Sequence, residues 1–146
     1  MSFTADISKF VEKANGNADK VIRKVIFDIG TKIVMRSPVG DAVFWKSPPP
    51  KGYAGGRFRG NWQYGFGMSP SGELDSIDKS GSVSTGRITA GVTGNPAIGI
   101  HYLTNNLPYA MRLENGWSRQ AVAPAAIVGR TVLEFQSMVE QAVAKL

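Results

Sequence analysis

The chain has 146 residues, a formal net charge of +6 and no cysteine. The length predicts a single domain, residues 1–146. Its 42% of hydrophobic residues is enough for a real core, and its 19% of charged residues argues against wholesale disorder. The lack of cysteine excludes disulfides, thiol catalysis and thiolate metal sites, and it suits a reducing cytoplasm. We expect no membrane span and no signal peptide, because no run of about 18 apolar residues occurs and the N-terminus lacks a basic start followed by an apolar block.

The basic surplus lies in the first half of the chain. Residues 1–36 hold seven Lys/Arg against four Asp/Glu, residues 37–67 hold four against one, and residues 68–146 hold six against six. A positive surface concentrates anions, including nucleic acid. The alternative is an ordinary solvated surface.

Residues 4–36 predict one long helix. Apolar residues recur every three or four positions, which places them on one face of a helix. Gly16 would loosen the helix, since glycine costs about 1 kcal/mol in a helix interior, but the apolar phase continues across it. Pro38 disfavours helical backbone at the preceding residue and so ends the helix. The predicted core stripe is Ile7, Val11, Ala14, Ala18, Val21, Val25 and Ile29.

Residues 38–58 predict a long projecting loop. Three consecutive prolines at 48–50 favour a stiff, extended segment, and glycines follow it as hinges. Such a long loop in a small domain is typical of a functional or a disordered segment, and a proline-rich loop can equally be an inert spacer. Phe44 and Trp45 alternatively pack against the chain's own core, since large aromatics also dominate cores. The residues that we expect at an interface with another subunit or neighbour are Phe44, Trp45, Pro49, Tyr53, Arg57 and Arg59.

Residues 59–104 predict a small antiparallel sheet. Residues 59–67 alternate aromatic and polar side chains, as in a strand with one buried face. Residues 68–86 are rich in Ser, Gly and Asp and predict a mobile loop with a short strand at Val83. Residues 87–93 and 97–104 each show strand-like alternation and are joined by a Gly-Asn-Pro turn, which predicts a hairpin.

Two helical elements follow the predicted sheet. Residues 109–115 predict one helical turn closed by Gly116. Residues 124–144 predict a final helix, and the whole chain is therefore expected to be α+β, with the N-terminal and C-terminal helices packed on the sheet. The expected core stripe of the final helix is Val128, Val132, Phe135, Val139 and Ala142, backed by Leu133 and Met138.

No arrangement of residues predicts catalysis. His101 is the single histidine and has no Asp or Glu within ten residues in sequence, so a structural histidine is expected. Glu73, Asp75 and Asp78 fall in a Ser/Gly-rich loop, which is a poor frame for a pair of catalytic carboxylates. We expect no enzyme activity, no catalytic or metal-binding residue and no cofactor.

Two segments resemble a known family. Residues 37–39 read Ser-Pro-Val and residues 56–62 read Gly-Arg-Phe-Arg-Gly-Asn-Trp, while residues 109–120 contain Tyr-Ala, Leu-Glu-Asn-Gly and Ser-Arg-Gln. In this order they resemble segments of the tail-completion proteins of long-tailed bacteriophages, also called neck or head–tail joining proteins. In that family's signature the Ser-Pro-Val and Gly-Arg halves are adjacent, whereas here residues 40–55 are inserted between them.

The resemblance implies a structural virion protein made in the host bacterial cytoplasm. Its copies would form a ring, expected to be six-fold, at the neck of the particle. The ring would join the portal and connector or stopper to the tail tube or tail-terminator protein, with phage DNA passing through the lumen without sequence specificity and no membrane involved. The alternative function is a nucleic-acid-binding module, in which Trp45 and Tyr53 stack on bases. The residues that would face DNA are Lys46, Lys51, Arg57 and Arg59.

Overall fold

The computed structural model describes residues 3–40, 48–116 and 126–146. The α+β class is confirmed: six helices and a two-stranded antiparallel sheet occur within these residues. In chain order the elements are α1 (Phe3–Arg36), α2 (Arg57–Gly60), β1 (Trp62–Phe66), α3 (Ser82–Gly94), β2 (His101–Asn105), α4 (Ala110–Asn115), α5 (Ile127–Leu133) and α6 (Phe135–Ala144).

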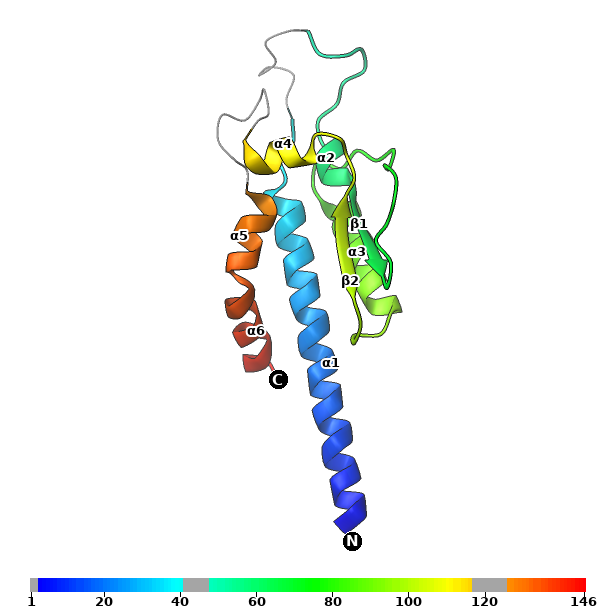
Figure 1. The fold of residues 1–146 in the computed structure, drawn as a ribbon, viewed down its shortest axis with the longest axis vertical. Helices are drawn as coiled ribbons and strands as arrows, with labels where there is room; N and C mark the ends of the chain where they lie inside the picture. Colours follow the sequence, from blue (N-terminus) through cyan, green and yellow to red (C-terminus); the bar gives the residue numbers. More distant parts are fainter. Residues whose placement is uncertain (1–2, 41–47, 117–125) are drawn as a thin grey trace.

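Helix α1 is the axis of the molecule (Figure 1). Helices α5 and α6 lie along one side of it, and the sheet with α3 lies along the other. The short helices α2 and α4 lie near the C-terminal end of α1, whereas its N-terminal part extends past every other element. The two strands pair over their full length, from Trp62 opposite Asn105 to Phe66 opposite His101.

The prediction of one long N-terminal helix is confirmed. The helix runs through Gly16 without a break and ends at Arg36, where the Ser37 hydroxyl donates to the carbonyl of Ile33 at 2.8 Å. The predicted core stripe is buried in its C-terminal half alone. Val25 is buried, whereas Ile7 and Val11 are 47% and 48% exposed because no other element reaches them.

The strand predicted over 87–93 is wrong, and so is the short strand at Val83, because both lie in α3. Ile88 and Val92 are separated by four residues and share one helix face, where both are buried. The same residues also fit the alternation of a strand, so their spacing alone supports either element. Asp78 lies just before α3 and satisfies amides at its start. Its carboxylate accepts hydrogen bonds from the amides of Gly81 at 2.9 Å and Ser84 at 2.8 Å.

The predicted hairpin between residues 87–93 and 97–104 is therefore also wrong. Strand β2 begins only at His101 and pairs with β1, which is far earlier in the chain. The first predicted strand, 59–67, is shortened at its start, because Arg57–Gly60 form α2. Of its alternating aromatics, Trp62 is buried and Tyr64 half-buried, while Gln63 on the other face is also buried, with its amide donating to the Gly72 carbonyl.

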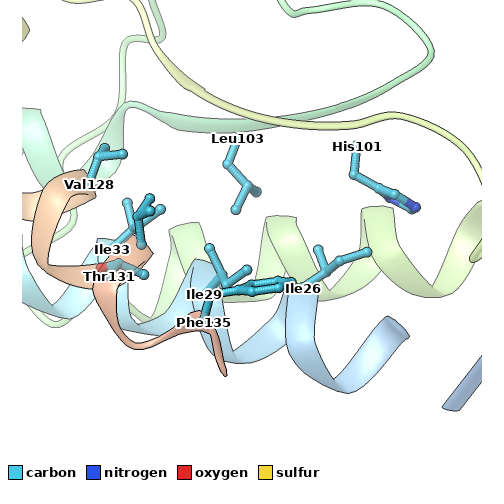
Figure 2. Close-up of a pocket in the computed structure, with 9 residues that line it drawn as sticks. Ile26, Ile29, Ile33, His101, Leu103, Val128, Thr131 and Phe135 are labelled. Carbon is cyan, nitrogen blue, oxygen red and sulfur yellow. The ribbon is translucent and has the colours of Figure 1, made fainter. Parts of the chain in front are cut away.

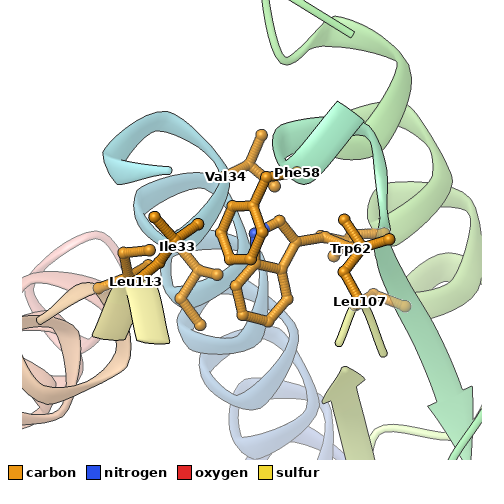
Figure 3. Packing of buried hydrophobic residues seen from close by; sticks show 9 residues of the cluster. Ile33, Val34, Phe58, Trp62, Leu107 and Leu113 are labelled. Atoms are coloured by element: carbon orange, nitrogen blue, oxygen red, sulfur yellow. The ribbon is translucent and has the colours of Figure 1, made fainter. Parts of the chain in front are cut away.

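The hydrophobic core lies where α1, α2, β1 and α3 meet the C-terminal elements (Figure 3). Phe58 and Trp62 stand nearly perpendicular to each other, with ring centroids 6.0 Å apart. The Trp62 indole nitrogen donates to the Ser37 hydroxyl at 2.7 Å, which satisfies the polar edge of the ring inside the core. The buried members of the cluster are Ile33, Val34, Phe58, Trp62, Ile88, Val92, Leu107, Leu113 and Ile127.

The C-terminal helix predicted over 124–144 is two helices, which meet at Glu134. The described part begins at residue 126, so residues 124 and 125 lie outside it. The buried face agrees with the prediction at Met138 and Ala142 but differs from it in α5, where Ile127 and Thr131 face inward. The predicted core residues Val128, Val132, Leu133 and Phe135 are instead exposed. Both sets have helical spacing, and the polar Thr131 favoured the wrong one, although its hydroxyl is satisfied by the Ile127 carbonyl at 2.8 Å.

Alanine substitutions at two glycines of α3 test how this helix packs. A Cβ added to Gly91 would lie 2.1 Å from the Tyr64 ring, whose hydroxyl is hydrogen-bonded to His101 at 2.7 Å, so the ring cannot easily move. We expect Gly91→Ala to destabilise the protein by about 1–3 kcal/mol through overpacking. Gly86 has open space around it, and Gly86→Ala should stabilise the helix by about 0.5–1 kcal/mol. Urea unfolding of both variants would measure the difference, and equal effects would contradict the packing of α3 on Tyr64.

Candidate functional site

The two halves of the split signature meet in the folded chain. The backbones of Gly40 and Gly55 touch, since a Cβ on Gly55 would lie 2.0 Å from the carbonyl oxygen of Gly40. Ser37, in the first half, receives the indole hydrogen bond of Trp62, in the second. The two residues at the ends of the insertion, Gly40 and Gly55, therefore lie next to each other. Any residue other than glycine at position 55 would separate these two backbones.

Arg59 joins the same two halves. Its guanidinium donates to the carbonyls of Ser37 at 2.8 and 3.1 Å, Met35 at 3.1 Å and Lys79 at 2.6 Å. The carbonyls of Met35 and Ser37 lie at the C-terminal end of α1, where backbone acceptors lack partners within the helix. Arg59 was expected to contact another molecule. The structure places its donors on the chain's own backbone, so its clearest role is to hold the loop base on α1.

The other predicted contact residues that the structure describes lie at the same end of the molecule. Arg57 pairs with Glu73 at 2.9 Å, with both side chains about 40% exposed. Pro49 and Tyr53 are half-buried and Lys51 is exposed, on the segment that rises above α2 and α4 in Figure 1. Phe44, Trp45 and Lys46 lie outside the described residues. The proposed interface and DNA-facing roles of all these residues remain predictions.

The second family-like segment packs against the first. Tyr109 lies with its ring centroid 6.0 Å from that of Phe58, and burial raises the pKa of the Tyr109 hydroxyl. The Glu114 carboxylate accepts hydrogen bonds from the backbone amides of Val128 at 3.2 Å and Gly129 at 3.0 Å. Gly116 closes α4 with a φ of 86°, as predicted. Residues 117–120 lie outside the described part. The motif residues that the structure describes thus gather at one end of the fold.

Both ring nitrogens of His101 have a partner within the chain. Its Nδ1 lies 2.7 Å from the Tyr64 hydroxyl and its Nε2 lies 2.7 Å from the Ala97 carbonyl. Burial raises the pKa of Tyr64, although Arg23 acts in the opposite direction. Within residues 3–40, 48–116 and 126–146, no three His, Asp or Glu side chains cluster in a way that would hold a metal ion. Within the same part of the chain, no helix has both the length and the hydropathy needed to cross a bilayer.

An open apolar groove lies on the side of α1 between β2 and α5 (Figure 2). Its cavity volume is about 270 Å³. Side chains of α1 form the floor, Leu103 and His101 of β2 form one wall, and residues of α5 and α6 form the other. The complete lining, called the apolar groove below, is Ile26, Ile29, Ile33, His101, Leu103, Val128, Thr131, Val132 and Phe135.

The groove residues of α5 and α6 that are apolar were predicted from the sequence to be core residues. Val128, Val132 and Phe135 have the helical spacing of a buried stripe. The break at Glu134 and the inward face through Ile127 and Thr131 turn this stripe towards the groove instead. No sequence signal distinguishes a groove wall from a core stripe, because both need apolar residues at the same period.

Two ion pairs link α1 to Glu134, the residue between α5 and α6. Glu134 accepts hydrogen bonds from Lys32 and Arg36, and these contacts hold the pKa of its carboxyl below the ordinary 4.5. Burial of Asp78 would raise the pKa of that carboxyl, but the hydrogen bonds from Ser84 and Gly81 outweigh it, so this pKa also lies below its ordinary value.

These two carboxylates predict an acid-sensitive fold. A depressed pKa in the folded state gives stability that is present above the unfolded-state pKa and is lost as the pH falls through the folded-state pKa. We therefore expect the free energy of unfolding to be steady near neutral pH and to decline below the ordinary values of 3.8 for Asp78 and 4.5 for Glu134. Urea unfolding at a series of pH values would measure this loss. Asp78→Asn should flatten the decline, and an unchanged decline would contradict the role of Asp78.

Comparison of the chain with protein-family models, curated proteins and solved structures gave no significant match.

Proposed function

We propose that the chain is a structural subunit of the neck of a tailed phage, where its copies form a ring that joins the portal and connector to the tail tube around the DNA channel. The observation that carries this proposal is the reunion of the split signature. The Ser-Pro-Val half and the Gly-Arg half are separated by the insertion in sequence, yet Gly40 touches Gly55 and Ser37 bonds to both Arg59 and Trp62. The resemblance is thus supported by spatial adjacency as well as by residue order.

The surface of the chain is also suited to assembly. Large apolar side chains are exposed on several separate elements, including Met111 on α4, Val132 on α5 and Ile98 before β2. Monomeric proteins rarely expose extensive apolar patches, which more often mark interaction sites. A ring requires a heterologous interface, in which one surface of a subunit meets a different surface of the next. The chain offers apolar side chains on different sides for such contacts.

Removal of the gene from the phage that encodes it tests this function. We expect DNA-filled heads and complete tails that stay separate in electron micrographs, with infectivity restored by the chain supplied from a plasmid. Joined, infectious particles in the absence of the chain would contradict the proposal. A second plasmid lacking residues 44–53 tests the loop: we expect a folded protein that does not restore joining.

The nucleic-acid-binding alternative receives less support from the geometry. The donors of Arg59 bond to backbone carbonyls, and Arg57 is paired with Glu73, whereas a cationic binding surface needs charges directed at phosphates. This alternative still predicts salt-dependent binding of short oligonucleotides. A gel-shift experiment at low salt would detect it, and Lys51→Glu should then weaken the shift. Absence of any shift would remove the alternative.

A further inference from the structure

Two apolar surfaces of this chain have no partner among its described elements. The first is a stripe on the projecting part of α1, called the N-terminal seam: Ile7, Val11, Ala14 and Ala18, all exposed. The second is the apolar groove. The seam and the groove lie on different parts of the molecule.

The N-terminal seam has the spacing of a helix that packs on another element. Its residues follow one another at steps of four, three and four, and the same steps continue to Val21 and Val25. An apolar repeat of 3.5 residues is typical of helices that pack lengthwise on a partner. Within the chain, α6 packs against α1, and Val25 on α1 and Met138 on α6 are both buried. The seam itself lies beyond the end of α6 (Figure 1).

The chemistry of the groove calls for an apolar occupant. Its two polar lining residues already have partners in the chain: His101 is bonded to Tyr64 and Ala97, and the Thr131 hydroxyl to Ile127 and Arg36. A polar small molecule would therefore find few free donors or acceptors among the lining residues. The nearest carboxylate on the α5–α6 side, Glu134, is neutralised by Lys32 and Arg36, so it does not oppose an apolar helix.

The seam cannot fill the groove of its own molecule. Both belong to the continuous helix α1, and Val11 and Ile29 are separated by 18 residues, or about 27 Å along the axis. A second copy has no such restriction. The seam is uncharged, and the two alanines in its C-terminal half allow the backbone of the helix to approach a wall closely.

We propose that the N-terminal seam of one copy docks into the apolar groove of the next. An amphipathic helix that lays spaced apolar residues into a groove is a common mode of recognition. The contact is heterologous, because the seam of each copy is left to dock in a further copy, and such contacts generate closed rings or open filaments. This inference rests on the proposed ring function for its biological setting and names the surfaces that would join the subunits.

Exposed positions on both surfaces allow a test that leaves the fold intact. The seam variant is Ile7→Asp with Val11→Asp, and the groove variant is Val132→Asp, at a position that is 65% exposed. Leu133→Asp is the matched control, because Leu133 is adjacent and 85% exposed but does not line the groove. Sedimentation of the purified full chains over a series of concentrations measures association. We expect the wild type and Leu133→Asp to associate alike, and the other two variants to associate at least about tenfold more weakly, since each buries a charge at the contact.

A mixture of the seam variant and the groove variant makes the test specific. The seam variant retains an intact groove, and the groove variant retains an intact seam. We therefore expect the equal mixture to form one-to-one dimers with the affinity of a single wild-type contact, while each variant alone stays monomeric. A groove variant that associates like the wild type would overturn the proposal and would indicate that seams pair with each other. A wild type that stays monomeric at every concentration, or a groove found by mass spectrometry to retain a lipid, would also overturn it.

The phage experiment separates this inference from the proposed function. If heads and tails join without the chain while the purified copies still associate through seam and groove, the neck function fails and the docking contact stands. If the chain is needed for joining but the groove variant restores it fully, the function stands and the docking contact fails.

Discussion

Trp62→Ala is expected to lower the free energy of unfolding by about 3–5 kcal/mol, the usual cost of removing a large buried aromatic side chain. Trp62 is buried against Phe58 at the centre of the core cluster, and its indole nitrogen donates to Ser37. The substitution therefore removes packing, leaves a cavity and deprives the end of α1 of one hydrogen bond. Urea unfolding followed by circular dichroism would measure the loss.

The conservative variant Trp62→Phe separates packing from hydrogen bonding. It keeps an aromatic ring in the core but removes the donor to the Ser37 hydroxyl. We expect a smaller loss of stability than for Trp62→Ala. The missing hydrogen bond should contribute about 1–2 kcal/mol to it, since an unmade buried hydrogen bond costs about that much. The smaller volume of phenylalanine should contribute the rest. A loss for Trp62→Ala below about 1 kcal/mol would contradict the burial of this side chain, because exposed substitutions usually stay within about 0.5 kcal/mol.

Arg59→Ala is expected to destabilise the protein by about 2 kcal/mol, because charged donors form the stronger hydrogen bonds of a fold. Its guanidinium holds the carbonyls of Met35, Ser37 and Lys79 together, and thereby fixes the end of α1, the base of the insertion and the approach to α3. Arg59→Lys should restore little of this stability, since a lysine cannot reach several acceptors with one planar group. Thermal unfolding would compare the variants.

Arg57→Ala is the matched control for Arg59→Ala. Arg57 lies two residues away and makes an exposed ion pair with Glu73. Exposed pairs contribute at most about 1 kcal/mol, so the fold should tolerate this change. If Arg59→Ala proved as mild as Arg57→Ala, the structural role of Arg59 would be wrong, and its earlier interpretation as an intermolecular contact would regain support. If only joining of the phage particle failed in Arg57→Ala, that arginine would be the better interface candidate.

Several elements were predictable because local chemistry allows one outcome. The continuous apolar period across Gly16 and the proline at position 38 defined α1 and its end, and both predictions are confirmed. Gly116 defined the end of α4, because glycine accepts the left-handed backbone that follows a helix. The absence of cysteine excluded thiol catalysis and thiolate metal sites, and the single histidine gave no pattern of metal ligands in the sequence.

Other elements were not predictable because one spacing satisfies two structures. Ile88, Ala90 and Val92 alternate as in a strand, yet Ile88 and Val92 also share a helix face. The hydrogen bonds of Asp78 to the first turn and the close approach of Gly91 to Tyr64 accompany the helix, and the second of these depends on a residue distant in sequence. In the C-terminal helices, two faces have the spacing of a buried stripe, and packing against the rest of the fold decides which of them is buried.

The sequence by itself therefore determined the class of the fold, the axial helix and the apolar character of its faces, since periodicity, proline and glycine act through the local backbone. The tertiary structure alone decided which apolar faces are buried. Within α1, Val25 is buried whereas Val11 stays in water, and within α5, Thr131 is buried whereas Val132 is exposed at the groove. Burial depends on which elements meet in space, and the spacing of residues along one helix carries no information about its partner.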